Sequence, residues 1–264
     1  MVTNRTVAFF DILGFRKLVE ERPLSELGPQ FLKTMDGVRT YLNRPVLPDQ
    51  NLPRLLNPPT QQFCLTFAFS DSLILISHDS SASSCLALLV YAVVAMRALM
   101  ASGFPVRAGI SFGEMFVDVS RSIFLGRALT AAFDSERDQQ WAGGLIDDSV
   151  AEALPELLVA DSQNMLNILF PCYPVPFKTG TTRNQRTLNW RWNLVVKYGT
   201  RSLFRPTLDT ESTKKVTNTL AYAKWIRSSG LAYPADPGSV PVEVRALFAG
   251  DGPPPPMFSH GDEW

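Results

Sequence analysis

The sequence has few of the residues that mark several common kinds of site. Among 264 residues there are two histidines, His78 and His260, and neither pairs with a plausible nucleophile. Its three cysteines, Cys64, Cys85 and Cys172, form neither a zinc-binding pattern nor a disulfide framework, which favours a reducing cytoplasm. A Walker phosphate loop and a GxGxxG dinucleotide-binding loop are both absent. These absences argue against histidine-based nucleophilic catalysis, a zinc site and the two commonest nucleotide-binding loops.

An excess of charge of either sign is also absent. Lys plus Arg and Asp plus Glu each number 25, so the formal net charge is zero. We therefore expect no nucleic-acid or membrane binding through bulk charge, although a local basic patch stays open. The longest apolar run, about Cys85–Met96, is too short to span a bilayer, and no secretory signal is expected at residues 1–6. With 45% apolar and 19% charged residues, the chain reads as an ordinary globular protein.

The charges are nevertheless unevenly placed along the chain. Asp134 to Asp161 holds eight acids and one base, whereas Ser162 to Leu208 holds no acid. The acid-free stretch contains Lys178, Arg183, Arg186, Arg191, Lys197, Arg201 and Arg205. A basic solvated face and a phosphate-facing wall both fit this pattern. A phosphate site elsewhere in the chain would favour the second interpretation.

Hydrophobic periodicity predicts alternating strands and helices. Strands are expected at 7–10, 63–69, 73–77, 106–112, 115–119, 144–146, 175–178 and 187–196. Helices are expected just after Gly14 and at 24–42, 80–101, 126–140, 149–158 and 209–229. The βαββαβ opening predicts an α+β fold with a ferredoxin-like core, a mainly antiparallel sheet covered by helices on one face. We place the main domain at 1–208, a C-terminal helix at 209–233 and a Pro- and Gly-rich tail at 234–264.

Two carboxylates stand out by their position in this pattern. Asp11 follows the first strand, and Asp71 lies at the tip of the hairpin between the second and third strands. In a βαββ core these two tips meet at one edge of the sheet. Two carboxylates with few other ligands suit Mg²⁺ or Mn²⁺ when substrate phosphates complete the coordination. Taken singly, each Asp is also an ordinary turn residue beside a strand.

Three motifs together give a more specific reading. They are Phe9–Phe15 (FFDILGF), Phe69–Ser72 (FSDS) and Val106–Gly113 (VRAGISFG). In this order and spacing they resemble the class III nucleotidyl cyclases, over about residues 5–200. Within that family the chain most resembles the Pycsar pyrimidine cyclases of bacterial anti-phage defence, through the first two motifs and a late VPFK segment followed by LNW.

The resemblance implies roles for particular residues. Asp11 and Asp71 would be the catalytic, metal-binding aspartates for two Mn²⁺ or Mg²⁺ ions, with the Ile12 carbonyl joining the second metal. The triphosphate would be held by Leu13, Gly14, Phe15 and Lys178, with Arg183 and Arg186 as weaker candidates. Backbone N–H groups at a helix start suit anions, and Gly14 allows a phosphate to come close. Arg107, inside the third motif, is open to a structural or a catalytic role.

The base pocket departs from that of the purine cyclases. Phe67 stands where those enzymes have a lysine, and Ile123 stands where they have the base-reading aspartate, three residues before Gly126. An apolar slot does not hydrogen-bond purine edges, so purine selection by the usual route is not expected. The resemblance to the Pycsar cyclases implies a pyrimidine substrate, UTP in preference to CTP, and no single residue decides between these two. The alternative is that both residues simply fill the core.

The family's transition-state Asn and Arg are also replaced, by Thr130 and Asp134. Arg127, Arg137 or a basic residue from another segment would then supply the missing cation. A purine cyclase with an unusual pocket, a catalytically silent nucleotide-binding regulatory domain and a cation-assisted phosphodiesterase therefore stay open. The resemblance further implies a homodimer with shared active sites, and a cyclic nucleotide read by a separate effector.

Overall fold

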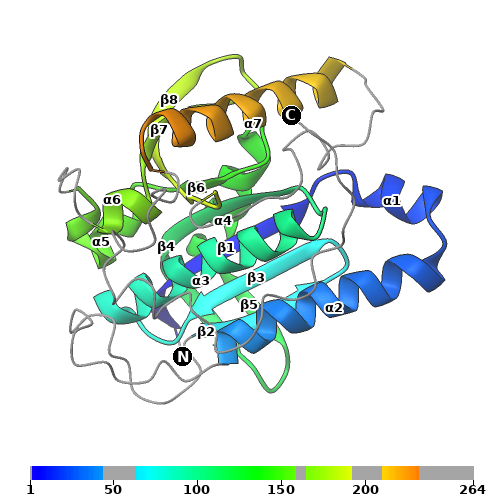
Figure 1. Ribbon diagram of the computed structural model, residues 1–264. Helices are drawn as coiled ribbons and strands as arrows, with labels where there is room; N and C mark the ends of the chain where they lie inside the picture. Colours follow the sequence, from blue (N-terminus) through cyan, green and yellow to red (C-terminus); the bar gives the residue numbers. More distant parts are fainter. Residues whose placement is uncertain (1, 44–63, 159–164, 192–209, 232–264) are drawn as a thin grey trace, which may run out of the picture.

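The computed structural model describes residues 2–43, 64–158, 165–191 and 210–231 (Figure 1). The strands are β1 (Val2–Ile12), β2 (Cys64–Phe69), β3 (Ser72–Ser77), β4 (Val106–Asp118), β5 (Ile123–Gly126), β6 (Gly144–Ile146), β7 (Cys172–Pro176) and β8 (Thr182–Thr187). The α-helices are α1 (Phe15–Glu21), α2 (Leu24–Asn43), α3 (Ala82–Ala101), α4 (Arg127–Asp138), α5 (Val150–Ala153), α6 (Met165–Leu169) and α7 (Thr210–Ser228). A 3-10 turn, η2 (Pro155–Leu158), follows α5.

The strands form one mixed, mostly antiparallel sheet. Its order is β2-β3-β1-β4-β6-β8-β7, with β5 paired to β4. Only the β4–β6 pairing is parallel among the strands described. The first four strands lie in the order β2-β3-β1-β4 and are connected through α2 and α3, which is the ferredoxin-like arrangement. The α+β class expected from the sequence is confirmed.

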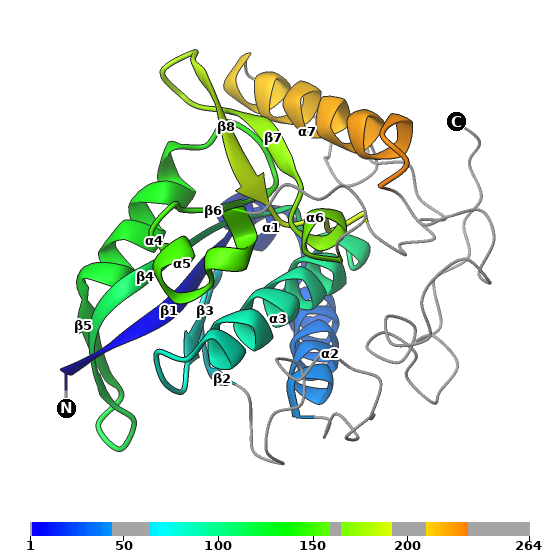
Figure 2. The ribbon, with the colours of Figure 1, turned by 90° about the vertical axis from the view of Figure 1, so that its left-hand side faces the viewer.

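Helices cover both faces of the sheet, which corrects the expected single covered face. Side chains alternate along β1, so Ala8 and Phe10 lie in the core shared with α3, whereas Val7 and Phe9 lie in the cluster shared with α4. Figure 2 shows α4 on one side of the strands and α3 and α2 on the other. Gly109 explains how α4 comes so close to β4, because a Cβ there would lie 2.1 Å from the Ala132 carbonyl oxygen.

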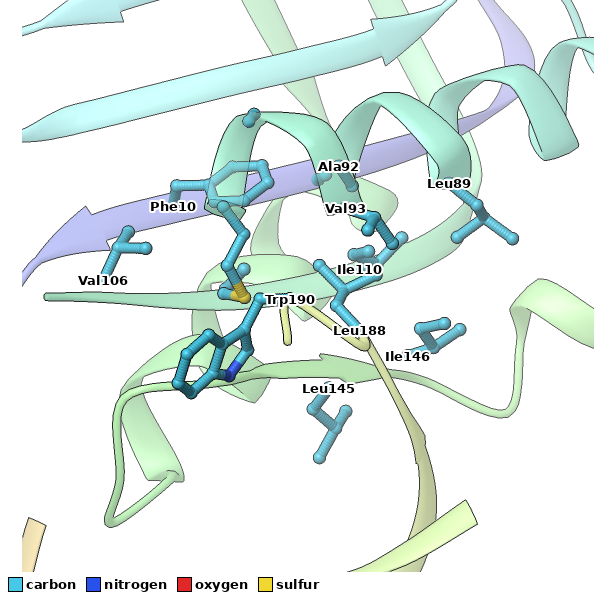
Figure 3. Close-up of a cluster of buried hydrophobic side chains, with 14 of the residues drawn as sticks. Phe10, Leu89, Ala92, Val93, Val106, Ile110, Leu145, Ile146, Leu188 and Trp190 are labelled. Carbon is cyan, nitrogen blue, oxygen red and sulfur yellow. The ribbon is translucent and has the colours of Figure 1, made fainter. Parts of the chain in front are cut away.

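Helix α3 is the central helix of the larger core. Ser81 caps it by accepting a hydrogen bond from the Ser84 N–H at 3.2 Å. It is the one helix among the described residues that is long and apolar enough to cross a membrane, but 72% of its apolar window is buried inside the protein. Ala92 and Val93 lie against Phe10 and Ile110 (Figure 3). The helix therefore serves as a core helix of this fold.

The strand β4 is continuous where the sequence predicted a turn at Gly113-Glu114. It pairs with β1 along its length, from Ile12 opposite Val106 to Val2 opposite Phe116. Gly113 has a φ of 159°, which is extended backbone, so it continues the strand. The chain reverses later, before β5, with Ser122 at a φ of 54°. The expected hairpin is wrong because a glycine beside a glutamate does not by itself force a turn.

The late part of the chain also differs from expectation. The strands expected at 175–178 and 187–196 are instead β7 and β8, joined by a tight turn in which Gly180 has a φ of 84°. The segment TRNQRT of β8 has no apolar alternation, so periodicity did not reveal it. Pro155 ends α5, so the helix expected at 149–158 is split into α5 and η2. Residues 192–196 lie outside the described residues, as does the Pro- and Gly-rich tail at 234–264.

Helix α7 packs onto the sheet through aromatic side chains. Tyr222 is fully buried, with its ring centroid 4.7 Å from that of Trp141, and its hydroxyl donates to the Leu188 carbonyl at 3.1 Å. Thr219 is also fully buried. The helix thus contributes to the same core as β6 and β7, while the domain boundaries drawn from the sequence stay a prediction.

Candidate active site

Asp11 and Asp71 lie together where β1 ends and β3 begins, at one end of these two inner strands. Asp11 is the penultimate residue of β1, opposite Ser72 of β3, and Asp71 directly precedes that serine. The Ile12 N–H donates to the Asp71 carbonyl oxygen at 3.0 Å. Ser70, with a φ of 53°, makes the tight turn that brings Asp71 there. The placement expected from the sequence is observed, and the metal-binding role of the two aspartates stays a prediction.

The carboxylate of Asp11 is in an environment that disfavours its negative charge. Its side chain is 29% exposed, and burial raises its pKa above the usual value. The guanidinium of Arg107 lowers this pKa, the charge of Asp71 raises it, and Lys215 and Lys178 lower it again. The net result is a raised pKa. Two neighbouring carboxylates of this kind are stabilised by a bound cation.

The donor set fits a divalent ion with hard oxygen ligands. Among the residues that the structure describes, no group of three or more His, Cys, Asp or Glu side chains is close enough to hold a metal. Asp11 and Asp71 are therefore a two-carboxylate site rather than a closed cage. Mg²⁺ and Mn²⁺ bind in this way when waters and substrate phosphates complete the coordination. Two carboxylates without Cys or His ligands do not support a structural zinc site here.

Arg107 connects Asp11 to a second buried acid. Its Nη2 lies 3.6 Å from Asp11 Oδ2 and 2.6 Å from Glu136 Oε1, while its Nη1 donates to the Gln139 carbonyl at 3.0 Å. The side chains of Arg107 and Glu136 are 7% and 3% exposed. Burial raises the pKa of Glu136, and Arg107 opposes that rise. This pairing was not predicted from the sequence, because Glu136 lies in an acidic stretch distant from the strand motif.

The loop after Asp11 turns at Gly14 before α1 begins. Gly14 has a φ of 72° and precedes α1, and nothing lies within 4 Å of where its Cβ would be. The Leu13 N–H is already donated to the Pro105 carbonyl at 2.7 Å. The Phe15 ring packs against Phe31 at 5.6 Å between centroids. Phosphate binding by Leu13, Gly14 and Phe15 stays a prediction. The Leu13 N–H is already hydrogen-bonded to the Pro105 carbonyl.

Lys178 is near enough to Asp11 for its charge to act on that carboxyl. It follows β7, and its backbone N–H donates to the Asp138 carbonyl at 2.9 Å, at the end of α4. Its charge lowers the pKa of both Asp11 and Glu136. Lys215 of α7 also lowers the pKa of Asp11. The sequence did not predict this, since no motif connects that helix to the site.

Two further described bases of the acid-free stretch, Arg183 and Arg186, have packing contacts of their own. The Arg183 guanidinium lies 4.1 Å from the centre of the Phe177 ring. Arg186 donates to Asn167 and, at 3.1 Å, to the Phe170 carbonyl. These contacts explain both arginines as packing residues of β8. Lys197, Arg201 and Arg205 lie outside the described residues.

The structure brings Phe67 against Phe124 rather than against Ile123. The ring centroids of Phe67 and Phe124 are 4.0 Å apart. Ile123 is 41% exposed, and Phe124, the next residue of β5, is more buried. Successive residues of a strand face opposite sides, so Phe124 shares the α4 face with Phe67. The base-pocket role of Phe67 and Ile123 stays a prediction. Phe124 is the residue of β5 that contacts Phe67, so it belongs with them in that predicted pocket.

The replaced transition-state positions have local partners of their own. The Thr130 hydroxyl donates to the Gly126 carbonyl at 3.3 Å. Asp134 lies 3.1 Å from Arg137 in an exposed ion pair. Arg127 is 3.6 Å from Glu114, and its side chain is 89% exposed. Arg127 and Arg137 are thus engaged on the surface of α4.

Comparisons with known proteins give matches only among solved structures. No protein-family profile and no curated protein matches the sequence. The adenylyl cyclase CyaB of P. aeruginosa has a TM-score of 0.49 at 14% identity, covering 74% of this chain and 98% of that chain. The dimeric guanylyl cyclase domain of the RhoGC fusion protein of Blastocladiella emersonii has a TM-score of 0.49 at 13% identity, covering 72% and 98%. The guanylate cyclase domain of RhGC from Catenaria anguillulae, in complex with GTP, has a TM-score of 0.45 at 12% identity, covering 71% and 97%.

Proposed function

We propose that the protein is a nucleotide cyclase that converts a pyrimidine nucleoside triphosphate, UTP in preference to CTP, to a 3′,5′-cyclic monophosphate and pyrophosphate. The observation that carries this proposal is the pairing of Asp11 and Asp71 at one sheet edge, joined by the Ile12 N–H to Asp71 carbonyl bond of 3.0 Å. The three motifs that resemble class III nucleotidyl cyclases supply the reaction class. The charges of Lys178 and Arg107 beside Asp11 support it.

The chain's own residues have distinct tasks in this reaction. Asp11 and Asp71, with the Ile12 carbonyl, would hold two Mg²⁺ or Mn²⁺ ions. When bound, such ions activate the ribose 3′-hydroxyl and neutralise the triphosphate. The 3′-hydroxyl would lose its proton to solvent, and its oxygen would bond to the α-phosphorus as the bond to the pyrophosphate oxygen breaks. Lys178 stabilises the negative charge that collects on the departing pyrophosphate.

The selectivity for a pyrimidine rests on the apolar character of the pocket wall. The rings of Phe67 and Phe124 are tilted by 39° with their centroids 4.0 Å apart, and they carry no hydrogen-bonding group. A wall of this kind favours a base by stacking and size rather than by reading its edge. UTP is placed before CTP on the overall resemblance to the Pycsar cyclases.

A homodimer with shared active sites is part of the proposal. The α4 face carries partly buried apolar side chains, among them Phe9, Phe67 and Phe124, that no second helix covers among the described residues. Phe133 on α4 is 41% exposed, and Phe69, beside the Asp71 turn, is 85% exposed. An apolar area of this kind next to a site is typical of an interface between chains.

The proposed cellular role follows from the motif resemblance alone. The cyclic nucleotide would be a cytoplasmic second messenger, made on phage infection and read by a separate effector protein. Neither nucleic acid nor a membrane is needed by this reaction.

The test is to incubate the purified protein with Mn²⁺ and ATP, GTP, CTP or UTP separately, and to identify the products by mass. Cyclic UMP or cyclic CMP, lost in Asp71→Asn, is the expected result. A cyclic purine nucleotide would overturn the pyrimidine assignment and leave a purine cyclase. No cyclic product from any nucleotide would overturn the enzymatic proposal.

A second candidate is a silent cyclase-like domain that binds nucleotide for regulation. The ion pair of Asp134 with Arg137 at 3.1 Å favours it, because an acid occupies the position where the family has its transition-state arginine. The presence of both Asp11 and Asp71 opposes it, since a silent domain needs neither metal ligand. In a silent domain, nucleotide would bind without turnover, and Asp71→Asn would change that binding little.

A further inference from the structure

The guanidinium of Arg107 is shared unequally between two acids. Its Nε donates to Glu136 Oε1 at 2.6 Å, and its Nη2 lies 2.6 Å from the same oxygen. The same Nη2 is 3.6 Å from Asp11 Oδ2, which is longer than a charge-assisted hydrogen bond of about 2.7–2.9 Å. Arg107 therefore pairs closely with the acid on α4 and only distantly with the acid of the candidate metal site.

The guanidinium is held on the α4 side by contacts that fix the end of this helix to β4. Arg107 Nη1 donates to the Gln139 carbonyl at 3.0 Å, and Gln139 Nε2 donates to the Ala108 carbonyl at 2.9 Å. Gln139 is fully buried. Gly109 lets the helix come this close, since a Cβ there would lie 2.6 Å from the Glu136 backbone nitrogen. The position of Glu136 relative to β4 is thus set by packing and by hydrogen bonds.

Burial makes the balance between the two acids important. The side chains of Arg107 and Glu136 are 7% and 3% exposed, so water does little to screen their charges. Among the residues that the structure describes, Asp11 is the one other acid within 4 Å of this guanidinium. A guanidinium that lost Glu136 would therefore close on Asp11. It would then compete with a divalent ion for the same carboxylate oxygens.

We propose that Glu136 is a positioning residue of this site, which holds the Arg107 guanidinium away from Asp11 and so leaves the Asp11 carboxylate free to bind a divalent cation. This inference rests on the proposed function, which it deepens. Without Glu136, a divalent ion would have to displace an arginine from its carboxylate ligand before it could bind. Glu136 does not contact the ion in this arrangement, and acts on it through Arg107.

The experiment measures Mn²⁺ binding to the full-length protein by titration calorimetry. Glu136→Gln is expected to weaken binding roughly tenfold, because Mn²⁺ must then break a charge-assisted contact between Arg107 and Asp11. Adding Arg107→Met to that variant should restore the wild-type affinity, because the competing guanidinium is gone. Asp134→Asn is the matched control on the same helix. It removes one acid whose partner is Arg137, at 3.1 Å, and it should bind Mn²⁺ like wild type.

A crystal structure of metal-free Glu136→Gln gives a direct second readout. The distance between Arg107 Nη2 and Asp11 Oδ2 should shorten from 3.6 Å to about 2.8 Å. Thermal unfolding of each variant without metal checks that it is folded at the temperature of the titration. If Glu136→Gln does not fold, the double variant still tests the inference, since it has no unpaired guanidinium and should bind Mn²⁺ as wild type does.

Four results would overturn the inference: no Mn²⁺ binding by wild type, wild-type affinity in Glu136→Gln, a loss of affinity in the double variant, or an unchanged distance in the crystal structure. A loss in the double variant would mean that Arg107 supports Asp11 instead of competing for it. Because the titrant is inorganic, these outcomes do not depend on turnover.

The proposed function and this inference can fail separately. If no nucleotide is cyclised but Glu136→Gln weakens Mn²⁺ binding and Arg107→Met restores it, the proposed function fails and the positioning role stands. If cyclisation occurs and Glu136→Gln keeps the wild-type affinity for Mn²⁺, the proposed function stands and Glu136 has no such role.

Discussion

Arg107 Nη2 lies 3.6 Å from Asp11 Oδ2, so a buried cation of β4 is placed beside the acid near the end of β1. The same guanidinium is 2.6 Å from Glu136 on α4, and it is balanced there by a second acid. A buried charge that loses its partner is costly, so this triad makes the geometry of Asp11 depend on a helix on the sheet's α4 face.

Glu136→Gln is expected to destabilise the fold by about 3 kcal/mol, because it removes the closest counter-charge of a buried guanidinium while keeping the side-chain volume. Urea unfolding followed by tryptophan fluorescence gives the free energy of unfolding. The matched control is Asp118→Asn, which breaks the Arg121–Asp118 contact of 2.6 Å at a site where Arg121 is 72% exposed. That surface pair should change the free energy little. Equal losses in the two variants would contradict the importance of the buried triad.

Mn²⁺ is expected to raise the Tm of the wild-type protein, because the ion binds the folded carboxylate pair and not the unfolded chain. Asp71→Asn should abolish this increase. In the absence of metal the same variant should be no less stable than wild type, since the charge of Asp71 raises the pKa of Asp11 and so works against its ionised form. Scanning calorimetry with Mn²⁺ and then with EDTA checks both points. A metal-dependent increase that survives in Asp71→Asn would place the ion elsewhere.

The features predicted correctly from the sequence are those set by local patterns. The runs of apolar residues around FSDS predicted β2, β3 and their turn, and the topology rules then brought Asp71 beside Asp11. β8 was not found, because its TRNQRT segment is polar and its first three residues are exposed. Local patterns reveal a strand only when burial imposes an alternation on it.

Contacts between distant segments were beyond the reach of the sequence. Glu136 pairs with Arg107, and Lys215 acts on Asp11, only because α4 and α7 are packed against the sheet by contacts far from any motif. Phe124 of β5 contacts Phe67 of β2 on the α4 face of the sheet, and no spacing rule predicted this contact between strands far apart in sequence. The site's aspartates were therefore predictable, whereas the residues that tune their charge were not.

Gly109→Ala is expected to destabilise the fold by about 3 kcal/mol or more. The new Cβ would lie 2.1 Å from the Ala132 carbonyl oxygen and 2.6 Å from the Glu136 nitrogen, both of them backbone atoms of α4. Helix α4 would have to move away from β4 and take Glu136 with it. The control is Gly37→Ala in α2, where nothing lies within 4 Å and the change should stabilise the helix by about 0.5–1 kcal/mol. Urea unfolding of both variants should therefore give shifts of opposite sign.

Only one of the three cysteines is expected to react quickly with a thiol reagent at pH 8. Cys172 is exposed, whereas burial raises the pKa of Cys64 to about 12 and that of Cys85 to about 11. The thiolate is the reactive form, so the two buried thiols should react only when the protein unfolds or the pH approaches those values. Ellman's reagent should detect one fast thiol in the native protein and three in urea. Cys172→Ser should remove the fast phase, and a fast thiol remaining in that variant would show that the core around β2 and α3 opens readily.

Phe69→Ser is expected to weaken self-association if the apolar area beside the Asp71 turn is an interface between two copies of the chain. Phe69 is 85% exposed, and a large aromatic ring at the centre of an interface commonly contributes 2 kcal/mol or more, which is roughly a thirtyfold change in dissociation constant. The control is Leu24→Ser, since Leu24 is 64% exposed at the start of α2, the helix that covers the opposite face of the sheet. Sedimentation velocity over a range of protein concentrations measures the association of each variant. If wild type stays monomeric, or if both variants dissociate equally, the proposed shared active site is wrong, and Asp11 and Asp71 must then work with residues of their own chain alone.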